Sequence, residues 1–392
     1  MRIAFSCNPA LGHLLPLLPL ATAAREAGHE VAFLGGSSLE GPTVRAGFRR
    51  APAGPPDLPT AFEQVPERAG LTGRRLAAMT WERVFGGVIA PEMAAGLMGL
   101  AREWRPDLLV HDDSELGSWI GAERLGIPHV SLQATAWRGT GIRLASSPLG
   151  RLRASLGLSE DPGLERWHRN GYLTTRPAAL WNPDDPMPAT TIPLRPVAQD
   201  ELSDDAPAGF AREPGSPSRV AVTLGTMLPG RLDAMTAILD GLERLDVEVV
   251  ATVGPGLDPA ALGPRPARIH VERYVPMSQL LPTCDALVFH AGSGTMLAAL
   301  AAGLPLVLLP VAADQPENAD RCVAAGVGIA LAPDERAAAD IERATRALLG
   351  EPAWRGAAAR ARDEIAAMPA PAEVLPALEA LAATGADGRL GG

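Results

Sequence analysis

A histidine precedes a glycine-rich turn in the stretch HAGSGT, residues 290–295. The apolar run before it predicts a buried strand, and the small residues after it predict a helix. The first N–H groups of a helix lack partners within the helix and its N-terminal end is electropositive, so such a turn is suited to binding an anion. A plain tight turn beside a core histidine would give the same pattern. The candidate anion ligands are His290, Gly292, Ser293, Gly294 and Thr295.

Three further polar residues follow the predicted ends of strands in the same half of the chain. Thr226 comes just after an apolar run, and its hydroxyl is a neutral donor suited to a diphosphate. Asp314, which only accepts hydrogen bonds, stands beside Gln315, which both donates and accepts, and the pair suits adjacent sugar hydroxyls. A capped helix start is the structural alternative for this pair. Because the carboxyl ends of parallel strands share one edge, we expect these residues to converge.

A second group of chemically capable residues lies in the first half. His13 stands where the first predicted strand turns into a helix. The positive helix end disfavours the imidazolium form, so the ring is suited to act as a neutral base. Asp112 and Asp113 end a later predicted strand. The structural alternatives are a ring that caps its own helix and a solvated strand end.

Two series of alternating strands and helices must position these groups. They are separated by the stretch 182–218, which is rich in Pro, Asp and Ser and is expected to hold the interdomain linker. Such alternation predicts an α/β, doubly wound fold with parallel sheets covered on both faces. We expect two domains, 1–205 and 206–392, with the last helix packing back on the first. The stretches expected to be surface excursions are 51–80 and 138–175.

Composition excludes several classes of protein. The 392 residues are 47% hydrophobic with a net charge of −10, so the chain can bury two cores and lacks the positive charge that nucleic-acid binding needs. All 35 basic residues are arginines, which excludes a Walker P-loop, a pyridoxal Schiff base and a kinase-type site. The three cysteines lack metal-ligand spacing, and no apolar run reaches the length of about 18 residues that a membrane span needs. We therefore expect a cytoplasmic protein without a membrane span.

The chain resembles family-one glycosyltransferases over nearly its whole length. The resemblance is strongest in VFHAGSGTMLAALAAGLPLVLLPVAADQPENADRCVAAGVG, which is similar to their donor-binding signature. It extends to NPALGHLLPLLPLATAAREAGHEV, PDLLVHD and RYVPMSQLLPTCDALV. The most similar members are bacterial enzymes that glycosylate polyketides, enediynes, macrolides and other natural products. The resemblance implies the GT-B fold, in which two Rossmann-like domains face each other across a cleft.

The resemblance also implies roles for the candidate residues of the second half. His290 would donate to the diphosphate of a nucleotide sugar, with Ser293 and Thr295 beside it. Tyr274 falls where the family often has a tryptophan that stacks on the nucleobase, and Val275 falls where the backbone reads the base edge. One departure is that many relatives have two glycines where this chain has Ala291 and a glycine.

In the first half, the resemblance makes His13 the base that deprotonates an acceptor hydroxyl. Asp112 matches the aspartate that orients this histidine best, and Asp113 is the alternative. The implied reaction is an inverting, metal-independent transfer that needs no cofactor beyond the nucleotide sugar. A sugar-nucleotide epimerase and a catalytically silent helper protein are alternatives, and a homodimer is one option for the oligomeric state.

The substrates are indicated by two weaker signals. Relatives that use uridine donors commonly have a glutamate three residues after the phosphate-contacting hydroxyl, where this chain has Ala298. A buried ribose 2′-hydroxyl without an acceptor costs about 1–3 kcal/mol, so we expect dTDP-sugars, of the deoxysugar kind, to be preferred over UDP-sugars. Four large apolar residues suggest a small apolar aglycone, with ordinary core packing as the alternative. The candidate acceptor-binding residues are Met79, Trp81, Phe85 and Trp137.

Overall fold

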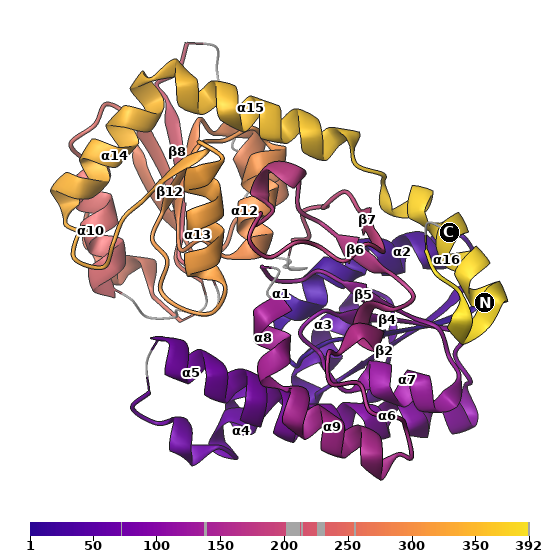
Figure 1. Cartoon of the computed structure of the whole chain (residues 1–392). Coiled ribbons are helices and arrows are strands. Elements are labelled where there is room, and N and C mark those ends of the chain that lie inside the picture. The colour runs from indigo at the N-terminus through magenta and orange to yellow at the C-terminus, as the bar shows by residue number, and fades with distance from the viewer. Residues whose placement is uncertain are drawn as a thin grey trace. The chain divides into compact units, whose positions relative to one another are not determined.

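The computed structural model describes residues 1–71, 73–136, 139–200, 212, 215–225, 232–254 and 256–390. The chain divides into two compact units, which are described separately below (Figure 1). Unit 1 comprises 1–175, 182–195 and 369–392, and unit 2 comprises 176–181 and 196–368. The domain boundary predicted between residues 205 and 206 lies outside the described residues.

Seven parallel strands in the described part of unit 1 form one sheet, in the order β3-β2-β1-β4-β5-β6-β7. They are β1 Arg2–Ser6, β2 Glu30–Gly35, β3 Arg49–Pro52, β4 Leu108–Asp112, β5 His129–Leu132, β6 Tyr172–Thr174 and β7 Thr191–Pro193. The neighbouring strands β1 and β4 read as apolar runs because helices cover both faces of the sheet. Ser6 of β1 pairs with His111 of β4, so the two strands end together at one edge of the sheet.

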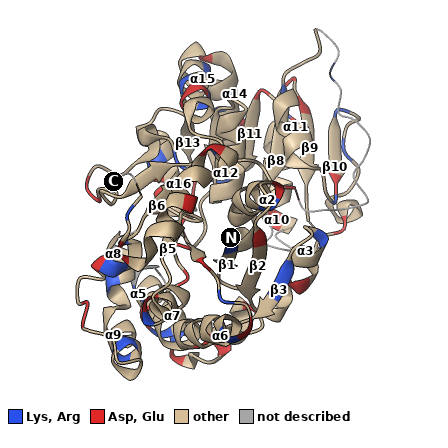
Figure 2. Cartoon of the chain, turned by 90° about the vertical axis from the view of Figure 1, so that its right-hand side faces the viewer, with Lys and Arg blue, Asp and Glu red and all other residues tan. Residues whose placement is uncertain are grey.

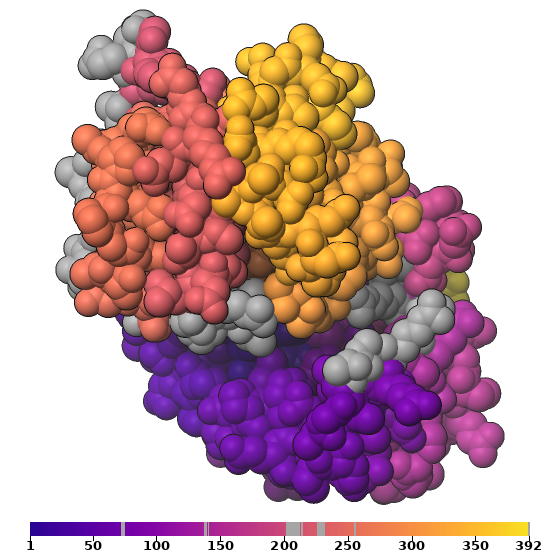
Figure 3. Space-filling model, turned by 90° about the vertical axis from the view of Figure 1, so that its left-hand side faces the viewer, coloured from indigo at the N-terminus to yellow at the C-terminus, as the bar shows by residue number. Residues whose placement is uncertain are grey.

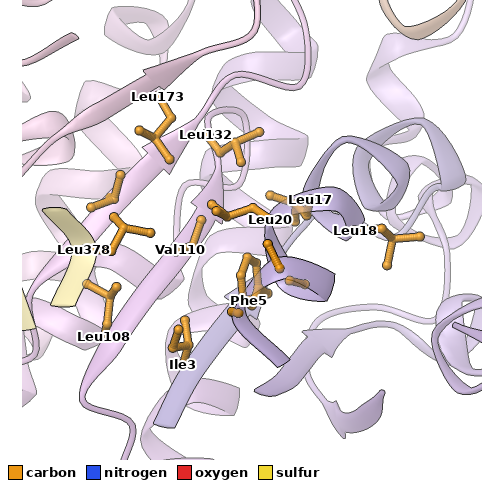
Figure 4. Close-up of a cluster of buried hydrophobic side chains, with 14 of the residues drawn as sticks. Ile3, Phe5, Leu17, Leu18, Leu20, Leu108, Val110, Leu132, Leu173 and Leu378 are labelled. Atoms are coloured by element: carbon orange, nitrogen blue, oxygen red, sulfur yellow. The ribbon is translucent and has the colours of Figure 1, made fainter. Parts of the chain in front are cut away.

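The helices of unit 1 cover this sheet and include the last helix of the chain. They are α1 Leu11–Leu14, η1 Leu15–Leu17, α2 Leu18–Glu26, η2 Ser37–Leu39, α3 Glu40–Arg45, α4 Leu58–Glu63, η3 Pro66–Arg68, α5 Gly73–Met79, η4 Thr80–Ile89, α6 Ala90–Glu103, α7 Ser118–Leu125, α8 Gly139–Leu144, α9 Ser146–Ser155, η5 Glu165–His168, α16 Pro371–Thr384 and η9 Gly385–Asp387. Helix α16 packs on α2, as Figure 1 shows. Its Leu378 joins the buried cluster formed by Phe5, Leu20 and Val110 (Figure 4).

The two stretches expected to be surface excursions contribute to the core, so that expectation was wrong. Leu58, Ala61 and Val65 of the first stretch are buried, and Trp167 and Tyr172 of the second are buried. The frequent prolines and glycines mark real turns, but the short elements between those turns still bury an apolar face.

One helical run in the described part of the chain, Arg75–Glu103, is long and apolar enough by composition to cross a membrane. Its Ile89, Met93 and Leu97 are fully buried in a core cluster of unit 1. Core packing therefore accounts for the apolar composition of this run.

In the described part of unit 2, six parallel strands form a sheet in the order β10-β9-β8-β11-β12-β13. They are β8 Arg219–Thr223, β9 Glu248–Thr252, β10 Ile269–Glu272, β11 Ala286–Phe289, β12 Leu306–Leu308 and β13 Gly328–Ala330. The helices are η6 Ala178–Leu180, α10 Leu232–Leu242, η7 Pro259–Leu262, α11 Met277–Leu280, η8 Leu281–Thr283, α12 Ser293–Ala301, α13 Gln315–Ala324, α14 Ala338–Gly350 and α15 Pro352–Ala367. Both units are thus parallel α/β sandwiches, which confirms the predicted fold class.

Charged residues are found on the helices that cover the sheets, and some of the sheet strands carry none. Figure 2 shows charged residues on helices such as α9 and α15, whereas β5 and β11 carry none. In the face of unit 2 seen in Figure 3, the yellow residues of α14 and α15 lie beside the orange-red residues that precede them in the chain. Helix α14 packs against α10 there, and their apolar residues close one face of the core.

Candidate active site

In unit 1, His13 and Asp112 meet at the edge where β1 and β4 end. The chain leaves β1, turns, and enters a helical run at Leu11, which places His13 in the first turn of that run. His13 Nδ1 lies 2.6 Å from Oδ2 of Asp112, the last residue of β4. The Asp112 side chain is fully buried, whereas that of His13 is 15% exposed, so the ring can reach a ligand and the carboxylate cannot.

Asp112 is held in its ionised form by the groups around it. Its Oδ1 accepts from the Ser114 backbone N–H at 2.9 Å, and its Oδ2 accepts from the Asn8 backbone N–H at 3.3 Å. The Ser114 hydroxyl also donates to the carboxylate, at 2.9 Å. Burial raises the pKa of Asp112, but His13 and the hydrogen bonds from His13 and Ser114 outweigh burial and hold the pKa below its usual value. An ionised carboxylate only accepts, so the His13 proton must sit on Nδ1.

Asp113 has different partners, and its pKa is shifted in the opposite direction. Its Oδ2 accepts from the Tyr172 hydroxyl at 2.8 Å, and its Oδ1 accepts from the Ala134 backbone N–H at 3.2 Å. Burial and the charge of Asp112 raise the pKa of Asp113 well above its usual value. Of the two aspartates, Asp112 is therefore the one that orients His13.

Three of the four candidate acceptor residues lie in the described part of unit 1. Trp81 and Phe85 contact each other edge to face, with ring centroids 5.4 Å apart, and both are half-buried. They lie on η4, a π-helix, and Met79 lies just before it. Wide helical turns of this type are frequent at functional sites. Trp137 lies outside the described residues.

In unit 2, His290 follows β11 and is enclosed by two glycines. A Cβ atom added at Gly225 would lie 2.4 Å from the ring, and one added at Gly292 would also lie 2.4 Å from it. Only glycine therefore leaves room for the ring at either position. Burial lowers the pKa of His290, against the opposing effects of the Thr223 backbone and Asp314, so the ring is neutral at physiological pH. Sequence reasoning missed Gly225, although the turn TLGT that contains it was a visible signal.

Helix α12 begins at Ser293, three residues after His290. Gly292 is its N-cap and has no side chain to satisfy the first N–H groups, so those of Ser293, Gly294 and Thr295 point out of the helix end. The Ser293 hydroxyl is directed elsewhere, since it donates to Asp314 Oδ2 at 2.5 Å. The backbone of this turn is thus better placed than the Ser293 side chain to meet an anion.

The remaining donor candidates are Gln315, Tyr274, Val275 and Thr226. Gln315 is buried, and its Oε1 accepts from the backbone N–H groups of Val311 and Ala312, which leaves its amide group as a donor. Tyr274 is half-buried after β10, and Val275 is buried in the core. Thr226 lies outside the described residues.

Comparisons with known proteins identify the family of the chain. The family models for the erythromycin biosynthesis protein CIII-like N-terminal and C-terminal domains match residues 22–147 and 236–381. Elloramycin glycosyltransferase of Streptomyces olivaceus is 34% identical in an alignment of 387 positions that covers 95% of this chain and 96% of that protein.

Solved structures of glycosyltransferases are similar to this chain over nearly its whole length. The glycosyltransferase SnogD from Streptomyces nogalater is 31% identical with a TM-score of 0.81, covering 97% of this chain and 99% of that one. The spinosyn rhamnosyltransferase SpnG, complexed with thymidine diphosphate, is 29% identical with a TM-score of 0.81, covering 97% and 100%. The chain therefore belongs to the erythromycin biosynthesis protein CIII-like family, and it is a nucleotide-sugar glycosyltransferase of natural-product biosynthesis with the GT-B fold.

Proposed function

We propose that this glycosyltransferase moves a deoxysugar from a dTDP-sugar to a hydroxyl of a small apolar aglycone, with inversion and without a metal ion. The observation that carries the proposal is the 2.6 Å contact between His13 Nδ1 and the ionised Asp112. This contact puts the ring proton on Nδ1, so Nε2 is the nitrogen that accepts a proton from the acceptor. The half-buried Trp81 and Phe85 support an apolar acceptor. The three buried, unpaired cysteines support a reducing, cytoplasmic location.

The proposed reaction couples one proton transfer to the exchange of one bond at the anomeric carbon. His13 Nε2 takes the proton of the acceptor hydroxyl, and the oxygen attacks the anomeric carbon of the donor. The bond from that carbon to the diphosphate breaks, and the nucleoside diphosphate leaves with the electron pair from the opposite face. Asp112 stabilises the imidazolium, while His290 and the N–H groups that open α12 receive the charge on the leaving group.

The preference for deoxythymidine rests on Ala298 of α12. It lies one helical turn after Thr295 and is half-buried with an apolar side chain. A ribose 2′-hydroxyl placed there would lose a hydrogen bond to water and gain none, at a cost of about 1–3 kcal/mol. The thymidine diphosphate bound to SpnG is consistent with this preference.

The test compares three donors that carry the same sugar on dTDP, dUDP and UDP. If the 2′-hydroxyl decides, the dTDP and dUDP forms are used alike and both exceed the UDP form. Ala298→Glu should raise the efficiency of the UDP form, whereas Ala302→Glu, at the other end of the helix, should not. Equal or better efficiency of the wild type with the UDP form would contradict the preference.

The transfer itself is tested with a panel of hydroxylated polycyclic aglycones. The anomeric proton coupling in the product should report a configuration opposite to that of the donor. His13→Ala should abolish transfer while leaving the affinity for dTDP unchanged, because His13 and the donor ligands lie in different units. Retained configuration, or wild-type turnover by His13→Ala, would overturn the mechanism.

A further inference from the structure

Arg176 belongs to a short segment that precedes the predicted linker yet packs within unit 2. The segment 176–181 is anchored there by Leu180, which is buried in a core cluster of that unit. The Ala178 backbone N–H donates to Glu364 of α15, and the Trp181 indole donates to the Arg176 carbonyl at 3.2 Å. Leu180 and Ala178 therefore hold the segment in unit 2, and its first and last residues contact each other.

The Arg176 side chain is 3% exposed, and its guanidinium reaches the donor site. Its Nη2 donates to the Ser293 hydroxyl at 2.7 Å and to Oδ1 of Asn318 on α13. Arginine does not lose its proton, so both partners must present acceptors to it. This requirement determines how both partners are oriented.

The orientation of Asn318 follows from its contact with Arg176. With Oδ1 turned toward the guanidinium, its Nδ2 donates to the Ala291 carbonyl at 2.7 Å and to Asp314 Oδ2 at 3.1 Å. The Ser293 hydroxyl accepts from Arg176 and also from Asn318, at 3.2 Å, so its single proton is directed to Asp314. Donors thus run in one direction, from Arg176 through both residues to the carboxylate.

We propose that Arg176 is a positioning residue of the donor site, which orients Asp314 toward the sugar through Ser293 and Asn318. The inference rests on the proposed function, in which Asp314 binds sugar hydroxyls. It adds a residue from outside the donor signature, and it assigns the fixed, planar Nη2 group that donates to both partners, rather than the charge, as the working feature. Lysine keeps the charge, but its side chain ends short of the position of Nη2 and its ammonium rotates freely, so it does not fix the two acceptors in the same way.

The test is calorimetric binding of dTDP and of dTDP-α-D-glucose to the folded protein. Arg176→Lys should weaken binding of dTDP-glucose about tenfold or more and that of dTDP less than about threefold. Arg219→Lys is the matched control. Arg219 is a buried arginine of the same unit; it lies at the start of β8 and binds Glu248 at the start of β9. This control should leave the ratio of the two affinities unchanged. Arg176→Gln repeats the test if the lysine variant does not fold.

A double-mutant cycle separates failure of the inference from failure of the proposed function. If Arg176 acts through Asp314, Asp314→Asn alone should lower the same ratio, and adding Arg176→Lys should lower it no further. No effect of Asp314→Asn would overturn the assignment of Asp314 to the sugar. An effect of Asp314→Asn combined with a wild-type ratio in Arg176→Lys, or with additive losses, would overturn the role of Arg176 alone.

Discussion

Replacing Asp112 with asparagine should reverse the tautomer of His13. The carboxylate accepts from His13, from two backbone N–H groups and from the Ser114 hydroxyl. If the asparagine oxygen stays on the Ser114 backbone N–H, its NH2 group faces His13 Nδ1 and the Asn8 backbone N–H. Toward this NH2 group the ring can bond only by accepting at Nδ1, and we expect this contact to outweigh the 3.2 Å contact of Nδ1 with the Ser114 hydroxyl. The ring proton then moves to Nε2, the nitrogen needed as the base.

The cost can be worked out from these contacts. The Asn8 N–H is left buried without a partner, at about 1–3 kcal/mol, and a charge-assisted bond becomes a neutral one, at about 1 kcal/mol more. We expect the free energy of unfolding to fall by about 2–4 kcal/mol in urea denaturation. Turnover should fall by about 10²–10⁴-fold, the range of general-base assistance.

The direct assay is ¹⁵N NMR of the histidine rings, with His13 assigned from a His13→Asn variant. Asp113→Asn is the matched control, because Asp113 is the neighbouring buried carboxyl group, its pKa is raised by burial and by Asp112, and its hydrogen bonds go to Tyr172 and Ala134 rather than to His13. This control should leave the His13 tautomer and the turnover close to wild type. A proton still on Nδ1 in Asp112→Asn would refute the reasoning.

Three more outcomes are expected. Burial lowers the pKa of His111 from 6.5 to about 4. The unfolded state therefore binds this proton first, and up to about 3 kcal/mol of stability is lost as the pH falls from 6.5 to 4. Urea denaturation of His111→Gln should show a shallower loss, whereas the exposed His270→Gln should keep the wild-type slope. Ala291 has a φ of 66°, so Ala291→Gly should relieve strain of about 1–2 kcal/mol while losing a buried methyl of about 0.8 kcal/mol, and its unfolding midpoint should stay near or above that of the wild type. Ala291→Val should lower that midpoint, and a stable valine variant would contradict the strain. Burial raises the pKa of Cys284 and of Cys322 to about 12, so a thiol reagent at mildly alkaline pH should label neither until denaturant is added.

Local sequence signals predicted the elements that carry the site. The strand expected before Asp112 is β4, and the turn at His290 does join β11 to α12. These strands are buried apolar runs bounded by clear turn residues, so the local pattern identifies them. The short strands β3, β6, β7, β10 and β13 have three or four residues each, and no local pattern predicted them.

The rest of the site depends on contacts between residues far apart in the sequence. His13 and Asp112 are 99 positions apart, and only the sheet register shows that Asp112, not its neighbour, meets the ring. Adjacent residues at a strand end point to opposite sides, so the two aspartates reach different partners. Arg176 and Asn318 are 142 positions apart, and no local pattern marks an arginine as part of a site.

The four passages of the chain between the units, at 175/176, 181/182, 195/196 and 368/369, limit how this enzyme can be recombined with its relatives. A chimera joined at residue 206 would keep Arg176 from one parent and take Asn318 from the other. It would also cover the core of unit 1 with a foreign α16, although Leu378 packs there among residues of the first parent. An exchange that respects the structure would move 176–181 together with 196–368 and keep 369–392 with unit 1. An exchange of sugar specificity between this enzyme and a relative thus needs four junctions, not one.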